Sequence, residues 1–463
     1  MQSDRWKDLR TFLRELEISD PAAIVRVREP IALDYEATAI AFEFAKHGKS
    51  PVLLFENVRG SRFPVLMNLF ACRSRYAFAL GVEENRLVQK WLANDAGPIK
   101  PEIVDSGPIL DTIYRGNDVD ISVLPIMRHF VEDGGAYLTN AMFVAKDPET
   151  GVRNASFHRL QVNGKTRLGT SLHSRRHLWN YARKAKSMGI DRLPVVIVVG
   201  CHPIITIGAG LWKGPIEADE YEIAGGFLNA PLPVVKGITV PIEIPATAEI
   251  AIEGQLLLDV NEPEGPFGEF TGYASERSTH HAVEITAILH RRDAIYHSIV
   301  PGISDEHTLL LGIAQEARQL KAIRAQYPSV VNVAYPKSGT RLLHCYISVN
   351  DPAPGEARNI AAVAIGDNLS LKLVVVVDGD VDVHNEEEVM WAVATRFQAS
   401  SDLEIIRVGM GAVLDPSNNE GTTSKLIIDA TCKRRPYARR HSLPSDAIEK
   451  ARSLVSRLLQ ARE

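Results

Sequence analysis

Apolar positions in the first part of the chain follow first a helical and then a strand-like spacing. Apolar residues recur at steps of three and four behind Ser3, which predicts an amphipathic helix with Ser3 as its N-cap. Runs at 51–58 and 63–70 flank the turn Gly60-Ser61 and predict two strands, followed by a helix that starts in RYAFALG. We expect residues 1–115 to form a small α/β domain. The apolar positions of the first helix are Trp6, Leu9, Phe12, Leu13 and Leu16.

The spacing then changes to short β-type runs separated by Gly, Pro and Asn turns, which predicts a barrel or sandwich over 116–303. The stretch Leu193–Trp212 is nearly long and apolar enough to cross a membrane, but its prolines and the β-branched run VVIVV favour a buried strand. The runs are AMFVAK, RLQVNG, PVVIVVG, AEIAIEGQLLLDV, HHAVEITAILHR and AIYHSIV.

A long helix and a second α/β domain are predicted for the remainder. An apolar stripe along 307–327 predicts a linker helix within 304–328. In 329–463, Asn385 before three glutamates predicts a capped helix, and the apolar stripe of the tail predicts a terminal helix that docks on its own domain or on a neighbouring subunit. Strands are expected near 330–334, 344–348 and 372–377.

Composition narrows the class of protein. The 463 residues are 45% hydrophobic and 24% charged, which excludes a disordered or fibrous chain. Lys plus Arg total 52 against 57 for Asp plus Glu, and the net charge of -5 argues against nucleic acid as a partner. The four cysteines form no CxxC pair and the start is not a signal peptide, so we expect a cytoplasmic protein without a zinc site, a disulfide framework or a membrane span.

One glycine pattern resembles a dinucleotide-binding loop. Gly208, Gly210 and Gly214 follow an apolar run, but Pro215 and an acidic stretch stand where a helix should begin to receive the pyrophosphate. We therefore expect only a turn at these glycines.

The string EGPFGEFTGY contains two carboxylates, Glu264 and Glu269, on either side of a Gly-Pro-Phe-Gly turn. If both face one apolar cavity, repulsion and burial raise the pKa of at least one, which gives a proton donor near neutral pH. An exposed acidic hairpin is the alternative interpretation.

A second string, NASFHRLQV, is expected to form a strand over 154–162. Its alternation places Asn154, Ser156 and His158 on one face and Phe157, Arg159 and Gln161 on the other. A cation in a β core needs an acidic partner, and the glutamates of the first string supply one. Further on, 174–179 gathers Arg175, Arg176 and His177 at a helix start, which suits an anion or a metal as well as local helix capping.

These strings resemble the UbiD-type decarboxylases, a family that uses prenylated FMN to remove or add CO₂ on unsaturated and aromatic acids. EGPFGEFTGY and NASFHR with SRRH are the most specific matches, and the likeness covers most of the chain. DEYEIAGGFLNAPLPVVKG and KLVVVVDGDVDVHNEEEVMWAVATR extend the resemblance through 219–237 and into the C-terminal part.

The resemblance implies roles for single residues. Arg159, Glu264 and Glu269 would form the catalytic network, with Glu269 as the proton donor. Asn154, His177 and Glu220 would bind Mn²⁺ or Mg²⁺ and through it the cofactor phosphate, with K⁺ nearby; their spacing alone could not have selected them, although their oxygen and nitrogen donors suit these ions. The cofactor-binding set implied is Asn154, Ser156, Phe157, His158, Arg159, Arg176, His177, Glu220 and Lys372.

The implied fold is α/β: an N-terminal α/β domain, a split β-barrel that binds prenyl-FMN, a linker helix and a C-terminal α/β domain. The implied activity is reversible non-oxidative decarboxylation of a furan, pyrrole or indole carboxylate through a covalent prenyl-FMN adduct. Residues 301–312 are expected to help shape the substrate pocket.

Other interpretations stay open at this point. A phenolic acid decarboxylase of the same family is the nearest alternative, followed by a flavin-binding partner subunit without activity and an ordinary FMN oxidoreductase. The resemblance further implies a flavin prenyltransferase as cofactor supplier and a homodimer or higher homo-oligomer.

Overall fold

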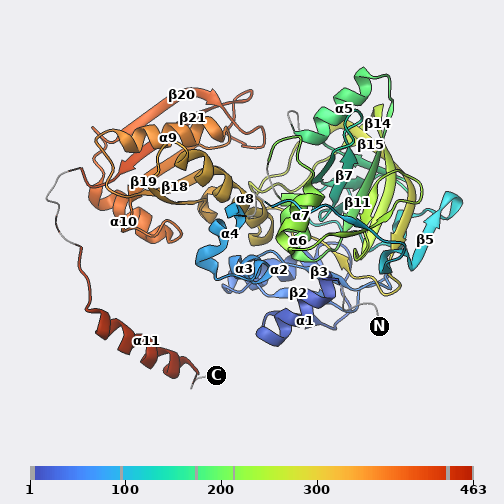
Figure 1. Ribbon diagram of the computed structural model, residues 1–463, viewed down its shortest axis with the longest axis horizontal. Coiled ribbons are helices and arrows are strands. Elements are labelled where there is room, and N and C mark those ends of the chain that lie inside the picture. Colours follow the sequence, from blue (N-terminus) through green and yellow to red (C-terminus); the bar gives the residue numbers. More distant parts are fainter. Residues whose placement is uncertain are drawn as a thin grey trace.

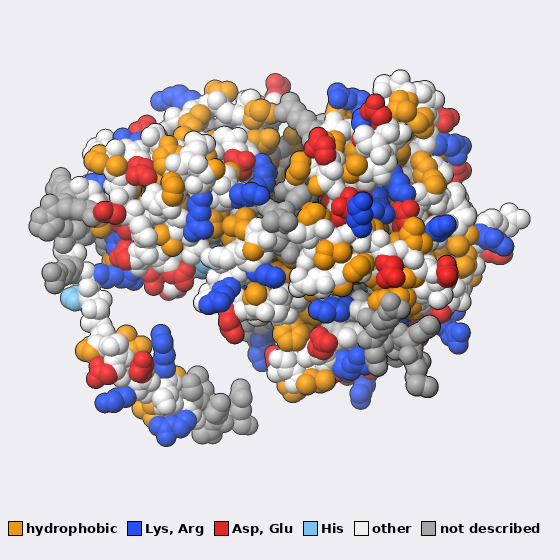
Figure 2. All heavy atoms as spheres, viewed as in Figure 1, with side chains coloured by type: hydrophobic (Ala, Val, Ile, Leu, Met, Phe, Trp, Pro, Cys, Tyr) orange, Lys and Arg blue, Asp and Glu red, His pale blue; other side chains and the backbone are white. Residues whose placement is uncertain are grey.

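The computed structural model describes residues 6–93, 97–172, 176–211, 214–433, 438 and 440–460, without the side chains of 278–280, 456, 459 and 460. Figure 1 shows two lobes with helix α8 (Asp305–Arg324) between them. The larger lobe holds the N-terminal segment and the β-rich middle, and the smaller lobe holds the C-terminal sheet. This is the mixed α/β architecture expected, and charges of both signs are interspersed on the face seen in Figure 2.

The N-terminal segment forms a four-stranded sheet in the order β1-β2-β3-β16 with helices packed against it. The first helix forms, but it begins at Leu9 and is capped by Asp8, whose carboxylate accepts from the Thr11 N–H. The expected cap, Ser3, lies outside the described residues. The elements are α1 (Leu9–Ser19), β1 (Ile24–Val27), α2 (Glu36–Lys46), β2 (Val52–Phe55), β3 (Val65–Met67), α3 (Arg73–Leu80), α4 (Leu87–Ala93) and β16 (Tyr296–His297).

The middle segment forms a curled nine-stranded sheet, ordered β6-β9-β10-β15-β14-β11-β7-β8, with β5 beside β15. All of its pairs are antiparallel, and three of them, β7–β8, β9–β10 and β14–β15, join consecutive strands. The expected split barrel is therefore present as a half-barrel. Its strands are β5 (Thr112–Arg115), β6 (Tyr137–Leu138), β7 (Met142–Lys146), β8 (Arg153–Phe157), β9 (Leu160–Val162), β10 (Arg167–Thr170), β11 (Arg192–Val199), β14 (Ile250–Glu264) and β15 (Ser278–His290).

The apolar stretch considered as a membrane span forms the buried strand β11 and the short helical segments after it. Among the described residues, no helix has both the length and the apolar character needed to cross a bilayer. A three-stranded sheet and two helices cover this part of the lobe. They are β4 (Glu102–Ile103), β12 (Pro233–Lys236), β13 (Glu243–Pro245), α5 (His177–Ser187) and α7 (Glu220–Leu228).

The glycine pattern at 208–214 does not form a simple turn, so that expectation is wrong. Helix α6 (Pro203–Ile205) continues into a π-helical segment, Thr206–Leu211, which contains Gly208 and Gly210. A Cβ at Gly208 would lie 2.6 Å from the Ala224 Cα, so glycine is required because this segment packs directly on helix α7.

The smaller lobe is a five-stranded sheet in the order β17-β18-β19-β21-β20. Strand β19 is central, and its valines enter two different cores, as the unbroken apolar run predicted. The three expected strands and the Asn385 cap are confirmed. The elements are β17 (Val330–Ala334), β18 (His344–Val349), α9 (Glu356–Asp367), β19 (Leu373–Asp378), α10 (Glu386–Arg396), β20 (Leu403–Met410), β21 (Thr422–Ala430) and α11 (Ser445–Gln460).

Backbone pairing crosses the predicted boundaries of the middle domain. Strand β5 pairs with β15 although it precedes residue 116, and β16 pairs with β3 at the far end. The division into 1–115, 116–303, 304–328 and 329–463 stays a prediction. The terminal helix α11 stands clear of the body in Figure 1, with Leu454, Val455 and Leu458 about half exposed.

Candidate active site

Arg159 is the centre of a buried ion cluster. Its Nε and Nη2 donate to Glu264 Oε1 and Oε2 at 2.7 and 2.8 Å, and its Nη1 donates to Glu269 Oε1. Glu264 is 0% exposed and Glu269 6%. The alternative of an exposed acidic hairpin is therefore wrong, because both carboxylates face one guanidinium inside the lobe.

Arg159 lies where the chain closes the curled sheet. The single strand expected over 154–162 is two strands, β8 at one end of the sheet and β9 next to the other end. His158 and Arg159 are the link, and the His158 N–H donates to the Ala141 carbonyl at 3.2 Å. The expected alternation of faces therefore ends at Phe157, because the chain changes its pairing partner there.

Side chains from other segments hold the turn that carries Glu269. The Gly265 N–H donates to Gln161 Oε1 at 2.9 Å, and the Gly268 N–H donates to Asp133 Oδ1 at 2.9 Å. A Cβ at Gly268 would lie 2.2 Å from the Phe130 ring, so only glycine allows this close approach. The motif glycines therefore serve to bring the acid into the site.

Burial shifts the protonation of this cluster. Burial raises the pKa of Glu269, and the charge of Glu264 raises it further, while Arg159 acts in the opposite direction. Burial alone would lower the pKa of Arg159, but the hydrogen bond to Glu264 and the charges of both acids raise it. The arrangement therefore pairs a permanent cation with an acid that keeps its proton more readily than an exposed glutamate.

A second group of donors is assembled at the starts of two helices. His177 opens α5 and Glu220 opens α7, while Asn154 comes from β8. Asn154 Nδ2 lies 3.0 Å from Glu220 Oε1 and 3.4 Å from His177 Nδ1, and the two latter atoms are 3.6 Å apart. Glu220 is 2% exposed. If the Asn154 amide rotates so that its oxygen takes the place of Nδ2, amide oxygen, imidazole nitrogen and carboxylate can converge on one cation.

The other candidate residues of β8 surround these donors. Ser156 Oγ lies 3.1 Å from Asn154 Oδ1 and 3.0 Å from His158 Nε2. The Phe157 ring packs on Gly210, where a Cβ would lie 2.3 Å from it. This contact joins the strand to the π-helical segment.

The two remaining basic candidates, Arg176 and Lys372, lie on different lobes of the molecule. Arg176 is the N-cap residue of α5 and makes no side-chain capping bond, whereas Arg175 lies outside the described residues. Lys372 belongs to the smaller lobe, where its ammonium pairs with Asp415 at 2.8 Å and contacts Ser417. The role of Lys372 at the cofactor phosphate stays a prediction.

Several residues beside these groups were not among the candidate site residues. Tyr137, far from both motifs, donates to the Pro266 carbonyl at 3.1 Å, and the Phe267 ring lies 5.1 Å from Arg159 Cζ. His307 meets Phe270 edge to face at 6.4 Å, and burial lowers its pKa to about 4, so it is neutral. Phe267 lies in the EGPFGEFTGY string and His307 lies within 301–312, whereas Tyr137 had no signal in the sequence.

Comparison with known proteins shows the class to which this chain belongs. Its segments match the three family models of 3-octaprenyl-4-hydroxybenzoate carboxy-lyase: the N-terminal domain at 20–94, the Rift-related domain at 102–304 and the C-terminal domain at 308–430. The chain belongs to the UbiD family and is a carboxy-lyase.

Particular relatives are similar over almost the whole chain. The UbiD-class enzyme HmfF from Pelotomaculum thermopropionicum, in complex with FMN, is 39% identical with a TM-score of 0.90, covering 96% of this chain and 99% of that one. An evolved dimeric form of it, in complex with prFMN, is 37% identical with a TM-score of 0.87, covering 96% and 98%. Anhydromevalonate phosphate decarboxylase from Methanothermobacter thermautotrophicus is 36% identical, covering 91% and 96%. Klebsiella pneumoniae 3,4-dihydroxybenzoic acid decarboxylase is 26% identical with a TM-score of 0.88, covering 97% and 99%.

Asp133→Asn tests how the turn is held. Asp133 Oδ1 accepts from the Gly268 N–H, and Oδ2 accepts from the N–H groups of His129 and Phe130. An amide keeps more of these bonds when its oxygen takes the Oδ2 position, which leaves the Gly268 N–H without an acceptor. We expect a loss of about 1–3 kcal/mol in the free energy of unfolding and faster amide exchange at Gly268. The exposed neighbour Glu132→Gln is the control. Equal exchange rates in both variants would contradict the assignment.

Proposed function

We propose that this chain catalyses the reversible non-oxidative decarboxylation of an aromatic or heteroaromatic acid with prenylated FMN as cofactor. The observation that carries the proposal is the pairing of one buried guanidinium with two buried carboxylates, Glu264 and Glu269. The FMN and prFMN complexes of HmfF support the choice of cofactor.

The donor set of Asn154, His177 and Glu220 suits a cation that anchors the cofactor phosphate. Mn²⁺ and Mg²⁺ accept mixed oxygen and nitrogen ligands, and phosphate oxygens complete their coordination. Rotation of the Asn154 amide would turn its oxygen toward His177 and Glu220. We place K⁺ near this site and assign cofactor contacts to Ser156, His158 and the neighbouring arginine Arg176.

The prenylated flavin, when bound, would supply the electron sink that makes cleavage of the carbon–carbon bond possible. The residues of the chain then have separate tasks. Arg159 orients both acids and presents positive charge to the substrate carboxylate. Glu269 holds a proton on a carboxyl oxygen and delivers it to the carbon that loses CO₂; in carboxylation it removes that proton. The buried rings of Phe267 and Phe270 would make the surroundings of the substrate carboxylate apolar, which favours its conversion into neutral CO₂.

Aromatic side chains beside the acids support an aromatic substrate. Phe267 and Phe270 lie on the Glu269 turn, and the neutral imidazole of His307 faces Phe270. We favour a furan, pyrrole or indole carboxylate, with a hydroxybenzoate as the alternative. The likeness to anhydromevalonate phosphate decarboxylase adds one phosphorylated acid to the substrate screen. A partner subunit without activity is disfavoured because Arg159, Glu264 and Glu269 are all present.

The wider assembly follows from the same proposal. A flavin prenyltransferase must supply the cofactor. We propose that both this enzyme and the prenyltransferase are cytoplasmic. We propose a homodimer or higher homo-oligomer, which the exposed apolar face of α11 supports because a helix of this kind is stable only when that face is covered.

Glu269→Gln tests the proton donor. An amide keeps the size of the side chain but cannot give up a proton, so we expect flavin to be retained and CO₂ release to fall by about 10²–10⁴-fold. The measurement is CO₂ release from a panel of aromatic acids by protein co-produced with a prenyltransferase and purified without oxygen. Glu276→Gln, on the exposed part of the same turn, is the control. Unchanged turnover would remove Glu269 from the mechanism.

The dependence of turnover on pH tests whether the pKa of Glu269 is raised, as its burial indicates. The donor acts only when protonated, so turnover is full below its pKa in the folded protein and falls as the pH rises through that value. Because burial raises this pKa, the falling limb should lie above about 4.3, the ordinary value for glutamate. The measurement is kcat against pH in the decarboxylation direction. If kcat instead increased with pH over this range, the assignment of Glu269 as proton donor would be contradicted.

His177→Ala tests the metal site. Loss of the imidazole should weaken metal binding about tenfold or more. The amount of bound flavin should fall with it, because the cofactor phosphate binds to the same cation. Elemental analysis and flavin absorbance of the purified protein measure the two contents. His47→Ala, an exposed histidine, is the control. Normal metal and flavin contents in the first variant would rule out the ligand assignment.

A further inference from the structure

An aromatic ring covers one face of the Arg159 guanidinium. The Cζ atom of Arg159 lies 5.1 Å from the centroid of the Phe267 ring, within the roughly 6 Å at which a ring attracts a cation. The hydrogen bonds to the two acids leave from the edge of the guanidinium: Nε and Nη2 donate to Glu264, and Nη1 donates to Glu269. The ring therefore acts on a part of Arg159 that neither carboxylate binds.

The contact of Arg159 with Glu269 is the more easily lost of its two ion pairs. Two hydrogen bonds fix the guanidinium on Glu264, whereas one hydrogen bond joins it to Glu269. A guanidinium held only by its Glu264 edge can still tilt about that edge, and the tilt would lift Nη1 away from Glu269. A ring that attracts the face of the guanidinium opposes this movement, because tilting separates the cation from the ring.

The ring of Phe267 is itself fixed in place. The Phe267 N–H donates to Ser275 Oγ at 3.2 Å, and the Phe267 carbonyl accepts from the Ser275 N–H at 2.8 Å. The Tyr137 ring packs against the Phe267 ring with centroids 4.7 Å apart, and Phe267 is buried. Tyr137 belongs to strand β6, which pairs with β9 directly after Arg159, so the same part of the sheet positions both the ring and the cation.

We propose that Phe267 is a positioning residue of the active site: its ring holds the face of the guanidinium, so that Arg159 Nη1 stays in contact with Glu269. The attraction between ring and cation, and not only the volume of the side chain, provides this restraint. The effect on turnover rests on the proposed function, in which Glu269 delivers the proton. The effect on the carboxyl group does not, because Arg159 lowers the pKa of Glu269 whether or not this group is the proton donor.

Other ionisable groups near Glu269 leave a test based on its pKa valid. Burial keeps Tyr137 and His307 neutral, because it raises the pKa of a phenol and lowers that of an imidazole. Replacing Phe267 changes the charge of no ionisable neighbour, so a change in the pKa of Glu269 reports the placement of Arg159. Ionisable side chains packed around the Glu269 turn are Arg159, Glu264, Asp133, Tyr137 and His307.

Fluorinated phenylalanines at position 267 test the proposal. The 4-fluoro and 3,4,5-trifluoro analogues keep the ring but withdraw negative charge from its face in two steps, which weakens its attraction for a cation. We expect the pKa of Glu269 to rise at each step, and further in Phe267→Leu, because Arg159 then stabilises the ionised carboxylate less. The measurement is the infrared band of the Glu269 carboxyl group against pH, taken as the difference from the same protein with Glu269→Gln. The falling limb of kcat should move to higher pH with it.

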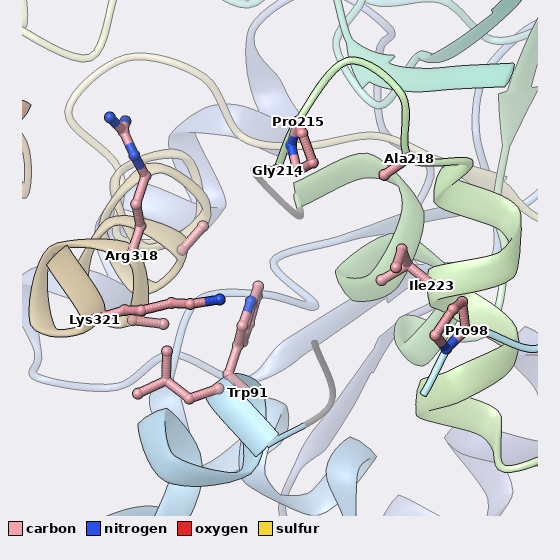
Figure 3. A pocket seen from close by; sticks show the side chains of 11 residues that line it. Trp91, Pro98, Gly214, Pro215, Ala218, Ile223, Arg318 and Lys321 are labelled. Carbon is pink, nitrogen blue, oxygen red and sulfur yellow. The ribbon is translucent and has the colours of Figure 1, made fainter. Parts of the chain in front are cut away.

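Two controls separate this restraint from a general effect on the protein. The same analogues at Phe270, whose ring faces His307, should leave the pKa of Glu269 unchanged. Trp91→Leu removes a buried ring beside a cavity of about 390 Å³ between α4, α7 and α8, whose described lining residues include neither acid and not Phe267 (Figure 3). This variant should lose stability, as Phe267→Leu does, without a change in the pKa of Glu269.

Equal pKa values of Glu269 in the wild type and both fluorinated proteins would overturn the proposal. Equal shifts in the Phe267 and Phe270 series, or a fall in the pKa with fluorination, would overturn it as well. The fluorinated proteins keep the test valid if Phe267→Leu fails to fold. Failure of the proposed function is recognised separately, since Glu269→Gln would then retain turnover while the pKa of Glu269 still rises with fluorination.

Discussion

Placing one arginine between two carboxylates inside the protein is the constraint on which the site depends. A guanidinium taken out of water needs a partner, and Glu264 supplies it through two nearly parallel hydrogen bonds. One cation balances one anion, so a second ionised acid would leave the cluster with an unbalanced negative charge in a dry environment. Burial and the charge of Glu264 raise the pKa of Glu269, so this is the acid whose protonation would restore the balance, and it is the one that we propose as the proton donor.

The fold brings this cluster together from distant parts of the chain. Arg159 is in the link that closes the half-barrel, Glu264 ends the long strand β14, and Glu269 lies on the turn that follows it. Asp133 and Gln161 hold that turn through its backbone N–H groups. The precision of the site therefore comes from backbone hydrogen bonding at the seam of the sheet and not from the charged residues alone.

The sequence predicted the main elements and the partners of Arg159, because periodicity and the need to pair a buried cation are local and general rules. It did not predict that 154–162 divides into two strands, since the change of pairing partner depends on the curl of the whole sheet. Asp8 rather than Ser3 caps the first helix, and Gly208 and Gly210 lie in a helical segment, where Gly208 packs on α7 and Gly210 packs on the Phe157 ring. Tyr137 and the pairing of Lys372 with Asp415 are contacts across the fold that no local pattern encodes.

The most direct test of the account is the protonation state of Glu269 in the folded protein at neutral pH. Isotope-edited infrared difference spectra between the wild type and Glu269→Gln isolate this one carboxyl group from all other acids. The account predicts that the difference contains the band of a protonated carboxyl group, which disappears as the pH is raised. A difference that contains only an ionised carboxylate at neutral pH would contradict it.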